Sequence, residues 1–356
     1  MAVTDTPYPD RLPSAHEILE RGRAAVEADI RAAVSRLHPT LEQIAAYHLG
    51  WDDDQGRGKA LRPVLAVLSA EAAGADAAVA APGAVAVELV HASSLLHDDI
   101  LDDDRTRHHR PAAWVAFGVG PAILAGDALL NLAHTVLAES PSHSSTQACR
   151  MLLHSSEALL HGQAEDLVFE NRPTVTVEEY LAMSARKTGA LLGTSAAVGA
   201  CLANAPAPLV KALESMGQHL GLGFQAVDDL LGIWGDPART GKPVFGDLRQ
   251  RKKSLPITAA LAADHPAARH LARLLATGPS SEQDLQRAAD LVDEGGGRDA
   301  TLREADRQLD QALEALNSAD MVSTARAELT TLITGLAHQA LSRWFKVRTA
   351  PLTTES

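Results

Sequence analysis

Aspartate residues are concentrated at two places in the chain, and both places are apolar segments. The first is HDDILDDD, which contains Asp98, Asp99 and Asp102, and the second is QAVDDLLG, which contains Asp228 and Asp229. On a helix Asp98 and Asp102 share a face, so their carboxylates repel each other by ~3 kcal/mol at roughly 5 Å and an effective dielectric of 20. Carboxylate, water and phosphate oxygens are the ligands that Mg²⁺ prefers. The two clusters therefore predict binding of divalent cations.

Composition favours a large helical protein with a small-molecule substrate. The 356 residues are 46% hydrophobic but only 3% aromatic, which suits close-packed helices rich in Ala, Leu and Val. A net charge of −13 argues against a nucleic-acid partner and against adsorption to an anionic membrane. Cys149 and Cys201 are too few and too far apart for a disulfide framework or a zinc site, which favours a reducing cytoplasm. No signal peptide and no membrane span are predicted from the apolar runs.

Helical periodicity with matching start and stop residues continues along the whole chain, and no alternating β-pattern stands out. The predicted helices cover 14–37, a short segment from Pro39, 61–73, a long segment from Pro82 through the first acidic motif, 121–137, 143–170, 177–203, 207–234, 255–264, 282–293, 299–317 and 320–346. No linker divides the chain. We expect one all-α bundle over residues 1–356, with tails at about 1–12 and 349–356, that brings both acidic motifs to a central cavity.

Four segments, GKALRP, HASSLLHDDILD, FQAVDD and TGKP, occur in an order that resembles the trans-isoprenyl diphosphate synthases, or polyprenyl synthetases. The resemblance is closest to the geranylgeranyl diphosphate synthase type and covers about Gly58 to Pro256 by motif. It implies an all-α isoprenoid synthase bundle that uses Mg²⁺ to condense isopentenyl diphosphate with an allylic diphosphate. The ordered combination of motifs is far more specific than any one of them.

The resemblance also assigns roles to the acidic motifs and to two lysines. Metal ligands that bridge to the allylic diphosphate are Asp98, Asp99, Asp102 and Asp228, and residues that bind substrate include Gln225, Asp229, Lys187 in KTG and Lys242 in TGKP. Gly232 stands where the family often has a third aspartate in the second motif. Asp236, one turn further on, is expected to substitute for it in part. Asp103 and Asp104 are either solvated or part of the site.

A second diphosphate needs its own cradle, and the resemblance assigns Lys59, Arg62 and His91 to isopentenyl diphosphate. An arginine fork gives bidentate contacts to phosphate, and a histidine adds a donor. Arg107 matches the first of two adjacent family arginines, which contacts the allylic diphosphate, whereas His108 stands where the second arginine would bind isopentenyl diphosphate. Histidine offers no bidentate fork, so we expect weaker binding of isopentenyl diphosphate unless Arg110 also reaches the site.

Three further expectations concern single residues near the first motif and on the surface. His97, next to Asp98, is interpreted as a packing residue at the helix end and not as a ligand. Ser93 and Ser94, five and four residues before Asp98, would leave the product tunnel open. This favours a product of twenty carbons, with a longer chain as the alternative, limited by Leu89, Val90 or the helix after Pro121. The basic run RQRKK, with Arg249 and Arg251 to Lys253, is either a surface patch or a ligand site.

The implied reaction is ionisation, condensation and elimination, in which loss of diphosphate gives an allylic cation that the alkene of isopentenyl diphosphate attacks. No general base stands beside the motifs, and the departing diphosphate is expected to take the proton. A class I terpene cyclase would share the fold but needs only one diphosphate site. A non-catalytic partner subunit of a prenyl synthase is the alternative outside enzymes. Family members are commonly homodimers, which is the expectation here.

Overall fold

The computed structural model describes residues 11–51, 58, 60–236 and 244–345, with side chains described up to residue 335. Most of these residues are helical, as predicted for an all-α protein. The chain forms two compact units. Unit 1 comprises Met1–Leu153, Thr194–Ser215 and Leu313–Leu336, and unit 2 comprises His154–Gly193, Met216–Ala312 and Ala337–Ser356.

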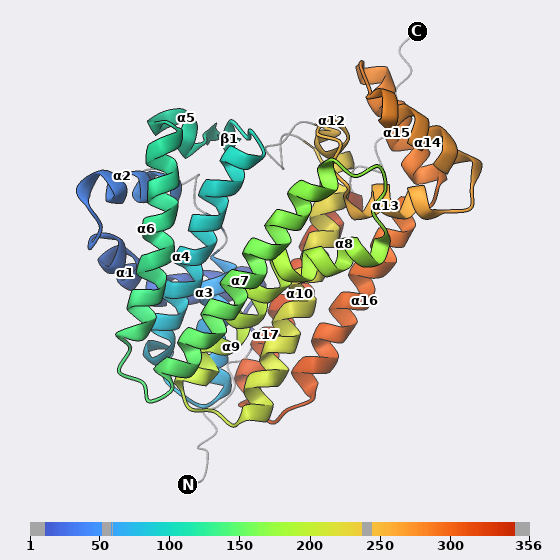
Figure 1. Cartoon of the computed structure of the whole chain (residues 1–356). Coiled ribbons are helices and arrows are strands. Elements are labelled where there is room, and N and C mark those ends of the chain that lie inside the picture. The colour runs from blue at the N-terminus through green and yellow to red at the C-terminus, as the bar shows by residue number, and fades with distance from the viewer. Residues whose placement is uncertain (1–10, 52–57, 59, 237–243, 346–356) are drawn as a thin grey trace. The chain divides into compact units, whose positions relative to one another are not determined.

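Unit 1 is built around two long apolar helices that lie side by side, α4 (Ala77–Leu101) and α6 (Val119–Ala138), with α3 (Leu61–Ala72) on α4 (Figure 1). Helix α1 (Ala15–Val34) packs on α3 and α4, and α2 (Pro39–His48) and α5 (Ala113–Phe117) pack on α6. Strands β1 (Thr106–Arg107) and β2 (Arg110–Pro111) form a small hairpin after α4. Close packing depends on small side chains, because a Cβ at Gly83 would lie 2.9 Å from Val198.

The helices of unit 2 surround two buried apolar clusters, one near α13 to α15 and one near α8 and α10. Its elements, some of which extend into unit 1, are α7 (Ser145–Glu170), α8 (Val177–Ser184), the π-helical turn η1 (Ala185–Gly189), α9 (Ala190–Leu202), α10 (Ala207–Trp234), α12 (Gly246–Arg249), α13 (Leu255–Ala262), α14 (Pro266–Thr277), α15 (Glu282–Glu294), α16 (Gly297–Asn317) and α17 (Ser323–Phe345). In the basic run, Arg249 pairs with Glu282, which favours a surface role for that residue.

Most predicted helix boundaries agree with the structure because the caps are local. Ser14 forms a capping box with Glu17, as expected for Ser three residues before Glu. The predicted start of α4 at Pro82 is wrong, since Asp76 caps the helix by accepting a hydrogen bond from the Ala78 N–H, and Pro82 lies inside it. The short helices α5 and α12, the hairpin and α14 were not predicted, although Pro266 at the first position of α14 is a typical start signal.

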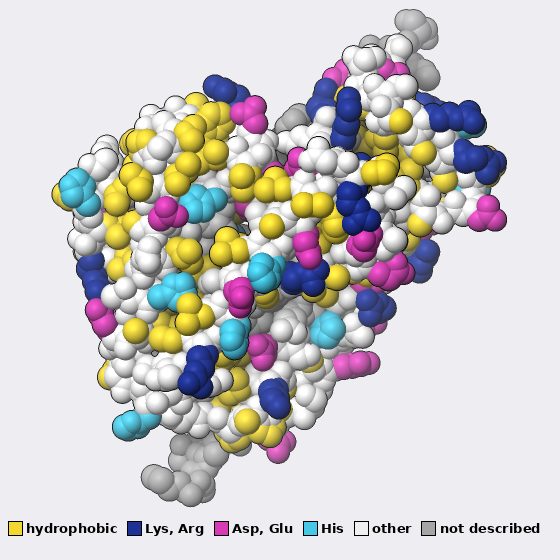
Figure 2. All heavy atoms as spheres, in the orientation of Figure 1, with side chains coloured by type: hydrophobic (Ala, Val, Ile, Leu, Met, Phe, Trp, Pro, Cys, Tyr) yellow, Lys and Arg dark blue, Asp and Glu magenta, His cyan; other side chains and the backbone are white. Residues whose placement is uncertain are grey.

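Within the described part of the chain, α4 and α6 are long and apolar enough, by length and composition, to cross a membrane. A buried core helix passes the same test, and 61% of the apolar window of α4 is buried. Helix α6 is more exposed. Its Val119, Ile123 and Leu124 are 45%, 41% and 59% exposed, and Figure 2 shows hydrophobic side chains gathered over the region of α5 and α6.

Candidate active site

The first acidic motif occupies the last turn of α4 and the residues that end it. Asp98 and Asp102 are partly exposed, and Asp102 caps the helix with its N–H donating to the Asp98 carbonyl at 2.9 Å. Asp103 then adopts a left-handed φ of 52°, which ends the helix. Asp99 differs from its neighbours because it is only 1% exposed. The motif therefore divides into a partly exposed pair and one buried carboxylate.

The buried carboxylate of Asp99 is held by Arg107 of the hairpin. The Nε atom of Arg107 donates to Asp99 Oδ1 at 2.8 Å, and its Nη2 donates to the same oxygen. Burial opposes the charge of Arg107, but the hydrogen bond and charge of Asp99, with the charges of Asp104 and Asp98, hold its pKa above the ordinary value. Asp99 thus orients the arginine that was predicted to contact the allylic diphosphate.

The hairpin turns through His108 and His109, whose φ values of 49° and 63° are both left-handed, as a two-residue type I′ turn requires. Arg107 pairs with Arg110 across it. His108 is exposed, and partial desolvation of its ring, followed by the charges of Arg107, Arg110 and His109, lowers its pKa. Arg110 is engaged elsewhere, because its Nη2 donates to the Tyr47 carbonyl at 2.8 Å and its guanidinium lies 4.7 Å from the ring centroid of Tyr47.

Two described residues of the predicted isopentenyl diphosphate cradle, Arg62 and His91, lie close enough for the charge of Arg62 to lower the pKa of His91. Arg62 is in the first turn of α3, and His91 is on α4. Burial lowers the pKa of His91 well below its ordinary value, and the charges of Arg62, His48, Arg107 and His108 lower it further. A neutral His91 can donate one N–H, and the surrounding cations favour an anion. Lys59 lies outside the described residues.

In unit 2, Lys187 is carried by the π-helical turn η1, where a π-turn interrupts the helix predicted over 177–203. Its Nζ donates to Asp166 Oδ2 at 2.6 Å. Helix α7 passes so close that a Cβ at Gly162 would lie 2.5 Å from the Lys187 backbone nitrogen, which is too short for any side chain. Short π-helical segments are frequent at functional sites. Lys242, the other predicted lysine, lies outside the described residues.

The second acidic motif lies on α10 and also divides into an exposed and a buried carboxylate. Asp228 is exposed, whereas Asp229 is 5% exposed. The Asp229 carboxylate accepts hydrogen bonds from the Tyr180 hydroxyl, from Gln225 Nε2 at 2.9 Å and from the Leu255 N–H at 2.8 Å. Burial, followed by the charge of Asp247, raises the pKa of Asp229 to about 7, although those hydrogen bonds favour the charged form.

Through these hydrogen bonds Asp229, on α10, connects α8 to the start of α13. Gln225 extends the network, because its Oε1 accepts a hydrogen bond from the Thr188 hydroxyl at 2.8 Å, next to Lys187. The KTG and FQAVDD motifs are therefore connected through side chains. Gln225 and Asp229 are thus fixed by hydrogen bonds, while Asp228 presents an exposed carboxylate.

The place of the missing third aspartate is filled by a residue that was not predicted. A Cβ at Gly232 would lie 2.5 to 2.6 Å from the carboxylate atoms of Asp247 on α12. The Phe245 N–H donates to the Ile233 carbonyl at 3.2 Å, which holds the start of α12 against the end of α10. Asp247 therefore lies beside Gly232. Asp247 is 15 positions after Gly232 in the chain, so the spacing of residues within the second motif could not predict this contact.

Comparison with known proteins identifies the family. The polyprenyl synthetase family model matches residues 39–292. A (2E,6E)-farnesyl diphosphate synthase of Mycobacterium tuberculosis is 44% identical over 336 residues, 92% of each chain, and a geranylgeranyl diphosphate synthase of the same organism is 44% identical over 310 residues, 85% of this chain and 89% of the relative. The crystal structure of a polyprenyl synthetase from Streptomyces coelicolor A3(2) matches with a TM-score of 0.83 and 48% identity, covering 89% and 98% of the two chains.

The chain belongs to the polyprenyl synthetase family. The resemblance drawn from four motifs is thereby confirmed, as is the all-α isoprenoid synthase fold. Family membership makes the protein a trans-prenyl diphosphate synthase.

The acidic donors of this polyprenyl synthetase suit a hard cation that shares its ligands with a substrate. Among the described residues, no three His, Cys, Asp or Glu side chains converge to form a metal cage. Mg²⁺ usually keeps several waters and is bound by one or two carboxylates together with substrate phosphates. The partly exposed pair Asp98 and Asp102, and the exposed Asp228, fit that requirement by donor type and exposure.

The predicted chain-length residues lie on the buried side of α4. Ser93 is 3% exposed, and Ser94 is partly buried with its hydroxyl donating to the His91 carbonyl at 2.9 Å. Leu89 and Val90 are 0% and 2% exposed. His97, by contrast, packs on α6, since a Cβ at Gly126 would lie 2.2 Å from His97 Nε2. This contact agrees with the packing role expected for His97.

Proposed function

We propose that this protein condenses isopentenyl diphosphate with an allylic diphosphate and that its product is geranylgeranyl diphosphate. The observation that carries the proposal is the group formed by the arginines Arg62 and Arg107 and the neutral His91, whose pKa is lowered by burial and by both arginines; the group lies in one unit with the first acidic motif. A terpene cyclase needs no second diphosphate site, so this group favours condensation over cyclisation. The retained Asp98, Asp102 and Asp228 argue against a non-catalytic partner subunit.

We infer the following roles for the residues of the predicted site. Asp98 and Asp102 of unit 1, and Asp228 of unit 2, are each proposed as ligands of Mg²⁺, which when bound neutralises the charge of a departing diphosphate. Asp99 keeps Arg107 in place for the allylic diphosphate, and Lys187 and Lys242 are each proposed to bind diphosphate. Arg62, neutral His91 and Lys59 would orient isopentenyl diphosphate so that its alkene meets the allylic cation. The departing diphosphate would take the proton.

The deciding experiment is incubation of the protein with Mg²⁺, isopentenyl diphosphate and an allylic diphosphate, followed by analysis of the products. A longer prenyl diphosphate supports the proposal. A hydrocarbon formed from one substrate would instead support the cyclase, and the absence of any product would support the partner subunit. Omission of Mg²⁺, with EDTA present, should abolish elongation.

Product length is proposed to depend on Ser93, where the side chain is small and buried. We expect Ser93→Phe to shorten the main product by one or two isoprene units, because the ring would occupy space that the growing chain needs, at a cost of about 1–3 kcal/mol if it is overpacked. Chromatography of dephosphorylated products measures the change. Ser93→Ala is the matched control and should leave the length unchanged. An unaltered distribution in the phenylalanine variant would place the limit elsewhere.

His108 is proposed to bind isopentenyl diphosphate best when protonated. Because partial burial and then the charges of its neighbours lower its pKa, and a bound diphosphate would raise it, we expect the KM for this substrate to increase as the pH rises from about 6 to 8.5 and the proton is lost. His108→Arg should lower that KM severalfold and flatten its pH profile, with little effect on the allylic substrate. His109→Arg is the control. If His108→Arg changes neither KM nor profile, His108 does not contact the diphosphate.

The family expectation of a homodimer fits the exposed apolar residues Val119, Ile123 and Leu124 on α6. We propose that this face contributes to a dimer of a cytoplasmic protein. Light scattering of the wild type and of Leu124→Glu would test the assignment.

A further inference from the structure

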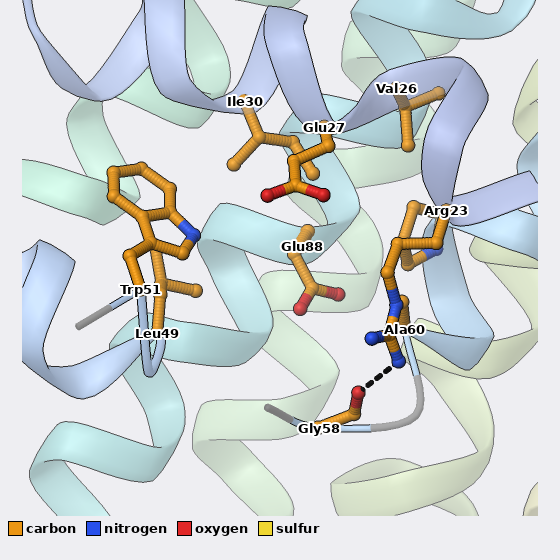
Figure 3. A pocket seen from close by; sticks show the side chains of 10 residues that line it. Arg23, Val26, Glu27, Ile30, Leu49, Trp51, Gly58, Ala60 and Glu88 are labelled. Atoms are coloured by element: carbon orange, nitrogen blue, oxygen red, sulfur yellow. Dashed lines mark hydrogen bonds between the residues drawn. The ribbon is translucent and has the colours of Figure 1, made fainter. Parts of the chain in front are cut away.

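Helix α1 is hydrogen-bonded to the first residue of the GKALRP segment. The Nη2 atom of Arg23 donates to the Gly58 carbonyl at 2.6 Å, as Figure 3 shows. Arg23 is also within 3.8 Å of Glu20, so its guanidinium is directed by an acid on its own helix. One residue earlier, α1 approaches α3 closely, because a Cβ at Gly22 would lie 2.8 Å from Val64 Cγ2. Arg23 therefore reaches the segment from a helix packed against α3.

The backbone at Ala60, two residues before the cradle arginine Arg62, has an unusual conformation. Ala60 has φ 51° and ψ 32°, a left-handed conformation that residues with a Cβ rarely adopt. It caps α3 without a side-chain acceptor, and its carbonyl accepts from the Val64 N–H at 3.2 Å. Strained backbone persists only where surrounding contacts hold it. The bond from Arg23 to Gly58, two residues away, is such a contact.

A pocket lies beside Gly58 and Ala60, and charged side chains of α1 and α4 line it. Arg23 and Glu27 of α1, Trp51, Ala60 and Glu88 of α4 are among its lining residues. Figure 3 shows the Glu88 carboxylate directed into this pocket, near Arg23 and Ala60. Burial raises the pKa of Glu88, while the charges of Arg62 and Arg23 act in the opposite direction. Glu88 thus lies in the field of both arginines.

We propose that Arg23 is a positioning residue for isopentenyl diphosphate: its hydrogen bond to the Gly58 carbonyl fixes the left-handed turn at Ala60 and so sets the position of Arg62. The inference rests on the proposed function, because it assumes that Arg62 binds this substrate. Arg23 itself is not required to touch the diphosphate. It acts by holding the backbone from which Arg62 projects.

The test compares Arg23→Ala with Arg23→Lys and with Arg21→Ala. Arg21 is the matched control, since it is an exposed arginine of the same helix that pairs with Glu71 and Glu328 and not with the segment. We expect Arg23→Ala to raise the KM for isopentenyl diphosphate about 10-fold, the order expected when a displaced Arg62 loses one charged hydrogen bond to the substrate. The kcat and the KM for the allylic diphosphate should stay within twofold. Arg23→Lys should recover part of the loss, because an ammonium can also donate to a carbonyl.

Calorimetric titration with isopentenyl diphosphate alone gives a readout that does not depend on turnover, and thermal unfolding checks the fold of each variant. Wild-type elongation with an unchanged KM and affinity in Arg23→Ala would overturn the positioning role while leaving the proposed function intact. Equal losses for both substrates, or the same loss in Arg21→Ala, would overturn it as well. A wild type that neither elongates nor binds isopentenyl diphosphate would overturn the proposed function and the inference together.

Discussion

Asp98→Asn and Asp228→Asn are each expected to lower kcat by roughly 10²- to 10³-fold, the range seen when one group that stabilises developing charge is removed. The helical fold should be retained, because both side chains are at least partly exposed and removal of a repelling acid does not destabilise an acidic cluster. Steady-state kinetics at saturating Mg²⁺ measures kcat, and circular dichroism measures helix content.

Asp103→Asn is the matched control for these variants. It makes the same change in the same cluster, at an exposed residue whose left-handed φ of 52° asparagine tolerates. Its kcat should stay within a few-fold of the wild type. Near-normal turnover in Asp98→Asn or Asp228→Asn would remove that residue from the proposed metal ligands.

Gly232→Asp, which restores the usual family residue, is expected to lower the free energy of unfolding by about 1–3 kcal/mol, the range for overpacking. The new Cβ would lie 2.5 Å from Asp247 Oδ2, and the new carboxylate would repel the one already there. Combining it with Asp247→Ala should recover most of the loss. Urea unfolding of the four proteins in this double-mutant cycle gives the coupling energy directly.

Gly232→Ala separates the two causes, since it adds the Cβ without a charge and should show only the steric part. If Gly232→Asp costs the same with and without the Asp247 side chain, the two positions are independent and Asp247 does not fill the place of the third aspartate.

The sequence predicted the helices of the site well because their signals are local. Caps such as Ser14 with Glu17 are read from adjacent residues, and α10 begins and ends where its apolar pattern does, at 207 and 234. The four motifs placed the acidic groups on the correct helices for the same reason. Family identity followed from their order, and the comparisons confirmed it.

What the sequence could not predict depends on contacts between distant residues. The sequence motif gives no reason to distinguish Asp98 from Asp99, yet only Asp99 is buried and hydrogen-bonded to Arg107. It likewise cannot show that Asp229 accepts a hydrogen bond from Leu255 or that Asp247 lies beside Gly232. The hydrogen bond from Arg23 to the Gly58 carbonyl joins residues 35 positions apart in the chain. Such pairs are determined by tertiary packing, and a single sequence contains no local signal for them.

The turn at His108 and His109 has a consequence for how this enzyme can be engineered. Both residues occupy a conformation that Asn-Gly adopts at lower free-energy cost, so the backbone shape does not need imidazole rings. An Asn-Gly turn would keep Arg107 opposite Arg110 while removing both rings, whereas insertion of one residue in the turn would change the register of the two strands, so that Arg107 would no longer pair with Arg110. The side chains of this turn can thus be changed without changing its backbone shape, whereas its length cannot be changed without altering the pairing of the strands.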